Sequence, residues 1–197
     1  MKSQVELSAL TNTANGYSLL KETIQTRNSG EIVNVYDVLD NTEGLVPFDT
    51  HFDKSQKGHR NLDVGGGKFN TATEHVKKYY GVTNLVFDPY NRTPEHNEQV
   101  LKEVTHNPVD TVSSFGVLNV ILEQDDRKEH ISLVHHLLKK GGHAFFTVWR
   151  GNGTGIPTAP QLNRDAHSLL QEVADIFGSD NTYSPADDMG NTIVAKK

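Results

Sequence analysis

From about residue 60 to the end of the chain, short apolar runs alternate with longer segments in which apolar residues recur at helical spacing. This alternation is typical of a parallel β-sheet covered by helices. The apolar runs predict strands at residues 61–64, 84–87, 109–114, 143–149 and 192–195. The pattern therefore predicts a three-layer α/β sandwich with a mostly parallel sheet.

The segments between these runs carry the signals of helix ends. Asn70 or Thr71 can cap a first helix that Gly81 closes, and Pro94 begins a second one. Helical spacing predicts helices at about residues 71–80, 94–104, 125–139 and 166–177, with Gly141 and Gly142 ending the third. Residues 117–121 either extend the third strand or turn above its end.

Residues 1–58 do not join this alternation. A short helix is predicted at residues 16–24, an apolar cluster of unassigned period lies at residues 32–39, and residues 41–58 have the composition of a loop. The length of 197 residues favours one domain. We therefore expect residues 59–197 to form the folded domain and residues 1–58 to cover part of its cleft.

Composition and charge exclude several classes of protein. The 19 Lys and Arg residues against 25 Asp and Glu residues give a net charge of -6, the wrong sign for a broad basic surface on duplex nucleic acid. The absence of cysteine excludes disulfides, cysteine-ligated zinc, iron–sulfur clusters and a thiol nucleophile. No run approaches the roughly 20 apolar residues of a membrane span, so we expect a cytoplasmic protein with no membrane partner. No metal site is expected, because His135 and His136 would point about 100° apart on a helix.

Candidate chemistry gathers where the first predicted strand ends, since open parallel sheets bind ligands beyond the carboxyl ends of their strands. There the sequence DVGGGKFN places three glycines, Gly65, Gly66 and Gly67, in a row. Glycines let the backbone turn tightly and approach a ligand. The loop lacks the dinucleotide spacing, because Asn70 stands where the last glycine would be, and it lacks the ending of a phosphate loop, because Phe69 follows Lys68. A tight turn without a ligand is the alternative interpretation.

An acidic residue ends the second predicted strand. Asp88 lies 21 positions after Gly67 (88 − 67 = 21), where a carboxylate can accept both hydroxyls of a ribose. A second acid, Asp63, lies two positions before the first glycine of the loop. Two acids without a phosphate-binding spacing favour a nucleoside that carries a positively charged tail, and S-adenosylmethionine is such a ligand.

Residues 59–150 resemble the class I S-adenosylmethionine-dependent methyltransferases. The stretches LDVGGGKFNTA, VFDPYNRTPEHN and VLNVI carry the resemblance, and they look like a small methyltransferase-like group of bacterial and phage proteins. The resemblance implies a Rossmann-like fold, S-adenosyl-L-methionine as the cofactor and methyl transfer as the activity. Two departures are that Phe69 replaces the family's third loop glycine, and that the short stretch before Asp110 leaves one strand–helix unit missing.

The resemblance also assigns roles to individual residues. It places Asp63, Gly65 and Gly67 beside the methionine moiety, with Gly66 in the same cofactor-binding loop. It places Asp88 on the ribose, and Tyr90 and Asn91 near the adenosine. Because a unit is missing, Asn97 or Ser113 could complete the adenine pocket. It implies that Asn119 lies near the transferred methyl group as the candidate catalytic residue. A turn residue with a structural role is the equal alternative for Asn119.

The end of the fourth predicted strand is the candidate acceptor site. An aromatic face beside a cation, as Trp149 and Arg150 would form, suits a planar or anionic acceptor, and Gln161 and Asn163 would extend the same rim. The alternative is a mobile surface loop with no ligand.

The methyl acceptor stays unidentified, and three functions remain open. A methyltransferase acting on a small molecule or a protein is favoured by the acidic charge balance. A nucleic-acid methyltransferase is the second, and it would need a basic rim of Lys68, Arg92 and Arg150; cytosine C5 chemistry is excluded because the chain has no cysteine. The third is a non-catalytic protein that binds S-adenosylmethionine.

Overall fold

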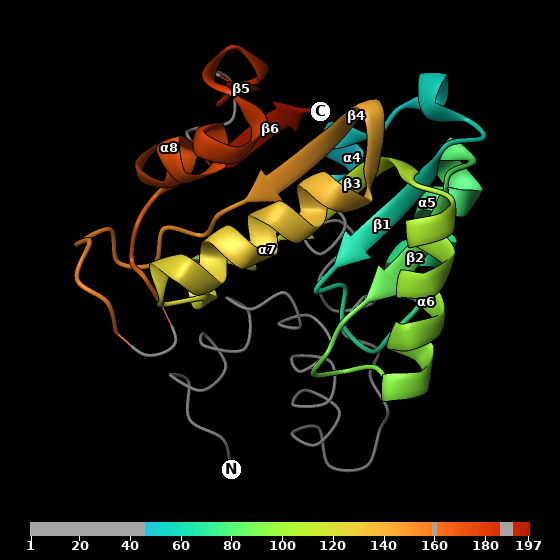
Figure 1. Ribbon diagram of the computed structural model, residues 1–197, viewed down its shortest axis with the longest axis horizontal. Helices are drawn as coiled ribbons and strands as arrows, with labels where there is room; N and C mark the ends of the chain where they lie inside the picture. The colour runs from blue at the N-terminus through green and yellow to red at the C-terminus, as the bar shows by residue number, and fades with distance from the viewer. Residues whose placement is uncertain (1–45, 159–160, 186–190) are drawn as a thin grey trace.

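A computed structural model describes residues 46–158, 161–185 and 191–197 (Figure 1). The helix predicted at residues 16–24 and the apolar cluster at 32–39 lie outside the described residues. Within the described part of the chain, no helix is long and apolar enough to span a membrane.

The described strands form a six-stranded sheet in the order β2-β1-β3-β4-β6-β5. Neighbouring strands among β1 to β4 run parallel, whereas β6 is antiparallel to β4 and to β5. The strand bounds are Arg60–Val64 (β1), Thr83–Phe87 (β2), Val109–Phe115 (β3), Leu138–Thr147 (β4), Thr182–Tyr183 (β5) and Thr192–Lys196 (β6). The predicted fold class, a mostly parallel Rossmann-like α/β sheet, is confirmed.

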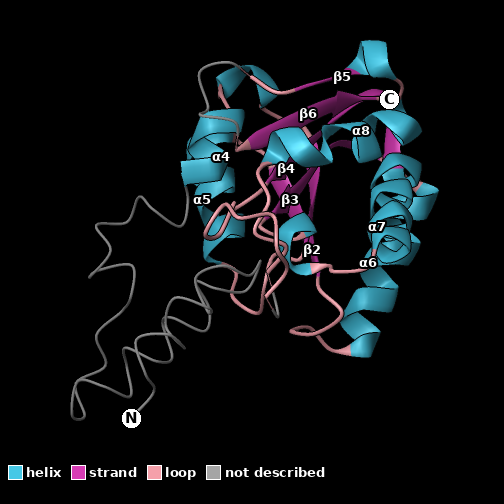
Figure 2. Ribbon diagram, turned by 90° about the vertical axis from the view of Figure 1, so that its left-hand side faces the viewer, coloured by secondary structure: helices cyan, strands magenta, loops and turns pink. Residues whose placement is uncertain are grey.

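Helices cover both faces of this sheet. Figure 2 shows α4 and α5 on one side of the strands and α6 and α7 on the other, and α8 packs against α7. The helix bounds are Val46–His51 (α4), Thr71–Tyr80 (α5), Pro94–His106 (α6), Gln124–Leu137 (α7) and Ala166–Phe177 (α8), with single 3₁₀ turns at Lys54–Gln56 (η1), Leu118–Val120 (η2) and Ser179–Asn181 (η3).

Alternation along β1 explains the two layers. Leu62 and Val64 join the large core beneath α6, α7 and α8, while the intervening Asn61 and Asp63 point to the opposite face, as the two-residue period of a strand requires. The α4 and α5 face has a smaller apolar core of Phe48, Phe52, Val76 and Val82. The α5 face of the central strands is therefore partly polar and buried.

Two sequence predictions were wrong. Residues 41–58 were expected to form a loop, but part of that stretch forms α4 and η1, because Phe48 and Phe52 are four residues apart and bury together. Gly141 and Gly142 were expected to end a helix, but α7 stops at Leu137 and both glycines lie within β4. A Cβ on Gly142 would stand 2.8 Å from the carbonyl oxygen of Asp110, so glycine here serves close backbone contact.

The open alternative at residues 117–121 is resolved in favour of a turn, since η2 follows the end of β3. The short strand β5 was not predicted.

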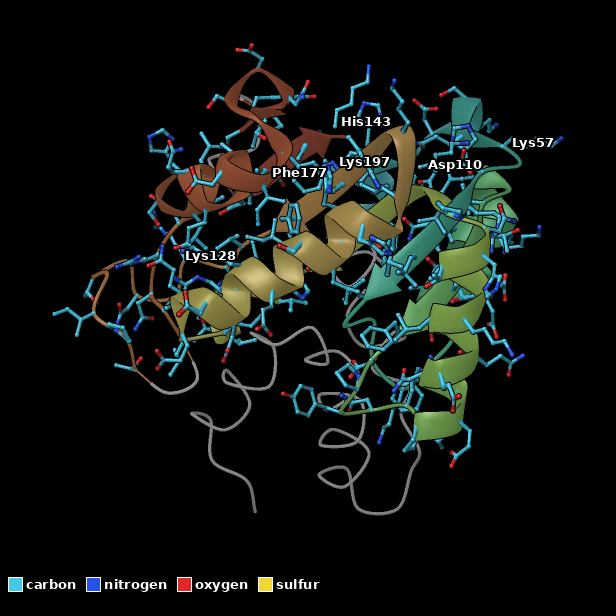
Figure 3. All side chains as sticks on the ribbon, in the orientation of Figure 1. Lys57, Asp110, Lys128, His143, Phe177 and Lys197 are labelled. Atoms are coloured by element: carbon cyan, nitrogen blue, oxygen red, sulfur yellow. The ribbon has the colours of Figure 1, made fainter. Side chains whose placement is uncertain are left out.

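The ion pair between Lys139 and Asp110 lies at the amino end of β3, and Figure 3 labels Asp110, His143 and Lys197 at this end of the sheet. The glycine loop is at the other end, where β1 exits.

The missing strand–helix unit is confirmed by the connection from β2 to β3, which contains only α6. β2 is consequently an edge of the described sheet, and α6 side chains bind its outward backbone groups. His96 Nε2 donates to the carbonyl of Val86 at 2.8 Å. Asn97 accepts from the amide of Asp88 at 3.0 Å and donates to the Asp88 carbonyl at 2.9 Å. The start of α6 thus replaces hydrogen bonds that a further strand would make.

Candidate functional site

The glycine loop leaves β1 in a conformation that favours glycine. Gly65 and Gly67 have φ angles of 82° and 75°, which a residue with a Cβ adopts only with strain. The amide of Gly65 donates to the carbonyl of Phe87 at 2.8 Å, which continues the β1–β2 pairing into the loop. The loop is therefore anchored to the end of β2.

Asp63 is buried at the base of this loop, with 4% of its surface exposed. Its Oδ1 accepts a hydrogen bond from Ser113 Oγ at 2.9 Å, and Ser113 Oγ accepts one from Asn61 Nδ2 at 2.9 Å. Burial raises the pKa of Asp63 to about 7, and the charge of Asp88 adds to this rise, whereas the Ser113 hydrogen bond and the charge of Arg92 oppose it. The site thus contains a carboxyl group that titrates near neutral pH.

The hydrogen bonds behind Asp63 extend across three strands. Asn61 Nδ2 also donates to Asn84 Oδ1 at 2.6 Å, and Thr111 Oγ1 donates to Asn61 Oδ1 at 2.8 Å. Asn84 in turn donates to Thr73 Oγ1 of α5 at 3.1 Å. The polar face of β1 is therefore satisfied as one network, in which each amide and hydroxyl has a defined orientation.

Gly66 is a glycine because Asp63 occupies the space beside it. A Cβ at Gly66 would stand 2.3 Å from Asp63 Oδ2 and 3.0 Å from Val86 Cγ1. We expect Gly66→Ala to push the Asp63 carboxylate off Ser113 and to lower the free energy of unfolding by about 1–3 kcal/mol. Urea denaturation measures this loss. Gly66 is not among the glycines with a positive φ, so the loss reports the clash with Asp63 and not backbone strain, and an unchanged free energy of unfolding would contradict the steric explanation.

Asp88 joins the glycine loop to the turn after β2. The carboxylate is 1% exposed; its Oδ2 accepts from the amide of Gly67 at 2.9 Å. Its Oδ1 accepts from the amides of Tyr90 and Asn91, each at 3.0 Å, and from Asn91 Nδ2 at 3.1 Å. Among the described residues only Gly67 donates to Oδ2, so this oxygen retains capacity for a second donor.

The structure brings most of the predicted cofactor residues together. Asp63, the glycines, Asp88 and Asn91 are connected by the hydrogen bonds above. Tyr90 takes part through its backbone, whereas its side chain is 91% exposed. Asn97 and Ser113, which could complete the adenine pocket, bind the backbone of Asp88 and the carboxylate of Asp63, and their role at the adenine stays a prediction.

Arg92 is part of the site in a way that the sequence did not indicate. Its Nε donates to the carbonyl of Gly67 at 2.7 Å, and its Nη2 donates to the carbonyl of Phe69 at 3.0 Å and to Asn70 Oδ1 at 2.9 Å. The sequence predicted Arg92 only as part of a basic rim. No motif signals this role, because it depends on a contact between segments 25 residues apart.

Asn119 lies in η2 at the end of β3 and is fully buried. Its Nδ2 donates to Gln161 Oε1 at 3.2 Å, its Oδ1 accepts from the amide of Trp149 at 3.3 Å, and its carbonyl accepts from the amide of Leu162 at 2.9 Å. These contacts join the end of β4 to the segment before α8. They favour the structural alternative for Asn119, and its catalytic role stays a prediction.

Trp149 and Arg150 begin the loop after β4, and both are exposed, Trp149 by 45%. Asn163 organises the loop from its other end with a φ of 56°: its Oδ1 accepts from the amide of Asn152 at 3.2 Å, and its Nδ2 donates to the carbonyl of Ile156 at 2.8 Å. Gln161 and Asn163 were expected on the rim, but they are 6% and 3% exposed. That expectation was wrong, because the Asn163 amide binds the loop from inside and Gln161 Oε1 accepts from buried Asn119.

Within residues 46–158, 161–185 and 191–197, no group of three or more His, Cys, Asp or Glu side chains is placed to hold a metal ion. The titratable groups of the site are instead the two carboxyls and the guanidinium, at the carboxyl ends of β1 and β2.

No family model and no curated protein matches the chain. Solved structures do match. The release-factor-specific protein-(glutamine-N5) methyltransferase from Alicyclobacillus acidocaldarius has 16% identity and a TM-score of 0.53, covering 78% of this chain and 89% of its own. A TehB-like SAM-dependent methyltransferase from Corynebacterium glutamicum has 15% identity and a TM-score of 0.52, covering 91% and 100%. Human N-acetylserotonin methyltransferase in complex with SAM has 17% identity and a TM-score of 0.53, covering 100% and 60%.

The chain therefore has the fold of the class I S-adenosylmethionine-dependent methyltransferases. At these identities the likeness defines the fold. The narrower resemblance to a small bacterial and phage group stays a prediction.

Proposed function

We propose that this protein is an S-adenosylmethionine-dependent methyltransferase. One observation carries the proposal: two buried carboxylates, Asp63 and Asp88, flank a glycine loop at the carboxyl ends of β1 and β2, in a class I methyltransferase fold. In an open α/β sheet this is the position at which ligands bind.

The residues present fit this cofactor. Its sulfonium and ammonium groups are cationic, and the buried acidic pair would stabilise a cation more strongly than an exposed pair would. The free capacity of Asp88 Oδ2 fits a ribose hydroxyl, and the glycine loop allows close backbone approach. Asn91 and Tyr90 would lie near the adenosine.

When bound, S-adenosylmethionine supplies a methyl group on a positively charged sulfur, which an acceptor displaces in line. Such a displacement needs positioning and exclusion of water more than a catalytic side chain. The chain's contribution would be the rigid loop that holds the cofactor and the Asn119 contacts that fix the start of the acceptor loop. A base is needed only where the acceptor must lose a proton.

The acceptor would bind at Trp149 and Arg150, whose exposed aromatic ring and guanidinium suit a planar or anionic molecule. A small molecule or a protein is favoured by the net charge of -6, and the structural neighbours include a protein-(glutamine-N5) methyltransferase and an N-acetylserotonin methyltransferase. Nucleic acid is the second candidate.

Calorimetric titration with S-adenosylmethionine and S-adenosylhomocysteine tests the proposal. We expect micromolar binding, about -8 kcal/mol, and at least about tenfold weaker binding in Asp88→Asn, whose amide cannot accept as a carboxylate does. Asp175→Asn on the exposed side of α8 is the control. Binding of neither compound by the folded wild type would overturn the proposal. Binding without product in an acceptor screen would favour the non-catalytic alternative.

A further inference from the structure

Arg92 reaches from the turn after β2 back to the glycine loop. Its backbone amide donates to the carbonyl of Asp88 at 3.0 Å, which fixes the turn, and its guanidinium binds the three loop acceptors on Gly67, Phe69 and Asn70 described above. We propose that Arg92 is a positioning residue that fixes the glycine loop and, through its charge, reduces the site's preference for a cationic cofactor over a neutral product.

The contacts on Gly67 carry the first half of this proposal. Its amide donates to Asp88 Oδ2 at 2.9 Å, and its carbonyl accepts from Arg92 Nε at 2.7 Å. Both polar backbone atoms of this residue are therefore held by side chains of the turn after β2. Gly67 lies between the end of β1 and the start of α5, outside any helix or strand. The side chains of Asp88 and Arg92 therefore fix the orientation of its backbone, which has a φ of 75°.

The charges carry the second half. Arg92 interacts electrostatically with both Asp63 and Asp88, and a guanidinium remains charged in proteins. With both carboxylates ionised, the three groups carry one net negative charge, and without Arg92 they would carry two. A site with two negative charges would bind a sulfonium compound better relative to the neutral thioether. This part rests on the proposed function.

Two variants separate the two halves. Arg92→Lys keeps the charge but cannot reproduce the three directed hydrogen bonds, while Arg92→Gln loses both. Lys102→Gln, an exposed position on α6, removes the same charge away from the loop and is the matched control.

The first measurement uses the protein without cofactor, by amide hydrogen exchange of Gly65 and Gly67. We expect Arg92→Gln and Arg92→Lys to speed exchange at Gly67 by about tenfold or more relative to Gly65, whose amide bonds to the carbonyl of Phe87 independently of Arg92. Lys102→Gln should leave both rates unchanged. Unchanged exchange at Gly67 in Arg92→Gln would overturn the positioning role, and this result does not depend on whether the protein binds S-adenosylmethionine.

The second measurement is the ratio of the dissociation constants for S-adenosylhomocysteine and S-adenosylmethionine. Arg92→Gln should raise this ratio by about three- to tenfold in favour of the cation, even as both affinities fall, and Arg92→Lys should keep the wild-type ratio. If the substitution only loosened the loop, the binding of both compounds would weaken by the same factor. An unchanged ratio in Arg92→Gln would overturn the charge role.

Discussion

Replacing Glu172 with alanine is expected to lower the free energy of unfolding by about 3–5 kcal/mol, because the variant leaves a buried guanidinium without its counter-ion. Glu172 of α8 receives two parallel hydrogen bonds from Arg127 of α7, from Nε to Oε2 at 2.7 Å and from Nη2 to Oε1 at 2.8 Å. Arg127 is 3% exposed and Glu172 is 8% exposed. Solvent therefore cannot replace the lost carboxylate.

The effect should reach the candidate site. Arg127 Nη1 also donates to the carbonyls of Ile121 and Leu122, at 2.9 and 2.8 Å, which holds the segment between η2 and α7. We expect loss of the pair to loosen this segment and, through it, the position of Asn119. Glu172→Ala should thus weaken any acceptor binding as well as stability.

Denaturant unfolding of Glu172→Ala checks this expectation. Asp175→Ala, an exposed carboxylate one turn along the same helix whose partner is Gln171, should cost less than about 1 kcal/mol. The double variant Arg127→Met with Glu172→Leu should be more stable than Glu172→Ala, since apolar residues of similar volume leave no buried charge. A loss below about 1 kcal/mol in Glu172→Ala would show that the pair contributes little.

Much of the fold could be predicted from hydrophobic periodicity. Strands such as β1 and β2 and the helix α8 were placed within a few residues, because each buries a run or a stripe of apolar side chains. The error at residues 41–58 has a tertiary cause. Phe48 and Phe52 are the aromatic residues of a largely polar stretch, and they are buried in one cluster with Val76 and Val82, a contact that the sequence does not reveal.

The sequence predicted those residues of the candidate site whose position follows from their spacing along the chain. It did not predict the roles that depend on contacts between distant segments. The glycine loop and Asp88 follow consecutive parallel strands, so their proximity follows from topology. Arg92, Asn97 and Ser113 were given other roles, because a side chain's partner depends on which atoms the folded chain brings near it. Asn119 shows the same limit, since its flanking residues are compatible with either role.

Replacing Asp63 with asparagine is expected to stabilise the protein above neutral pH. Burial raises the pKa of Asp63 to about 7 from 3.8, so the folded state binds a proton more tightly than the unfolded state does. The contribution of Asp63 to the free energy of unfolding is fully present below about pH 4 and is lost as pH rises through about 7. The unfolding free energy of Asp63→Asn relative to wild type should therefore increase between about pH 4 and 7 by about 2–4 kcal/mol.

A second buried group, His130, changes the unfolding free energy with pH in the opposite direction to Asp63. The pH profile of the wild type alone therefore hides both effects. His130 of α7 bonds to Ser114 Oγ at 2.8 Å, and burial lowers its pKa to about 4 from 6.5. Its contribution is present above about pH 6.5 and is lost as pH falls through about 4. Between these values the Asp63 and His130 contributions oppose each other, so the wild type should show a flatter pH profile than either variant.

The pH dependence of urea unfolding for wild type, Asp63→Asn and His130→Gln tests both signs together. Asp63→Asn should lose stability relative to its own maximum as pH falls below about 6.5, because the His130 dependence is then no longer opposed by Asp63. His130→Gln, whose amide can still bond to Ser114, should lose stability as pH rises towards about 7. Parallel profiles for the three proteins would mean that neither group has an altered pKa in the folded state. The buried Asp63 would then be ionised at neutral pH, and its hydrogen bonds and neighbouring charges would have to offset the cost of burying that charge.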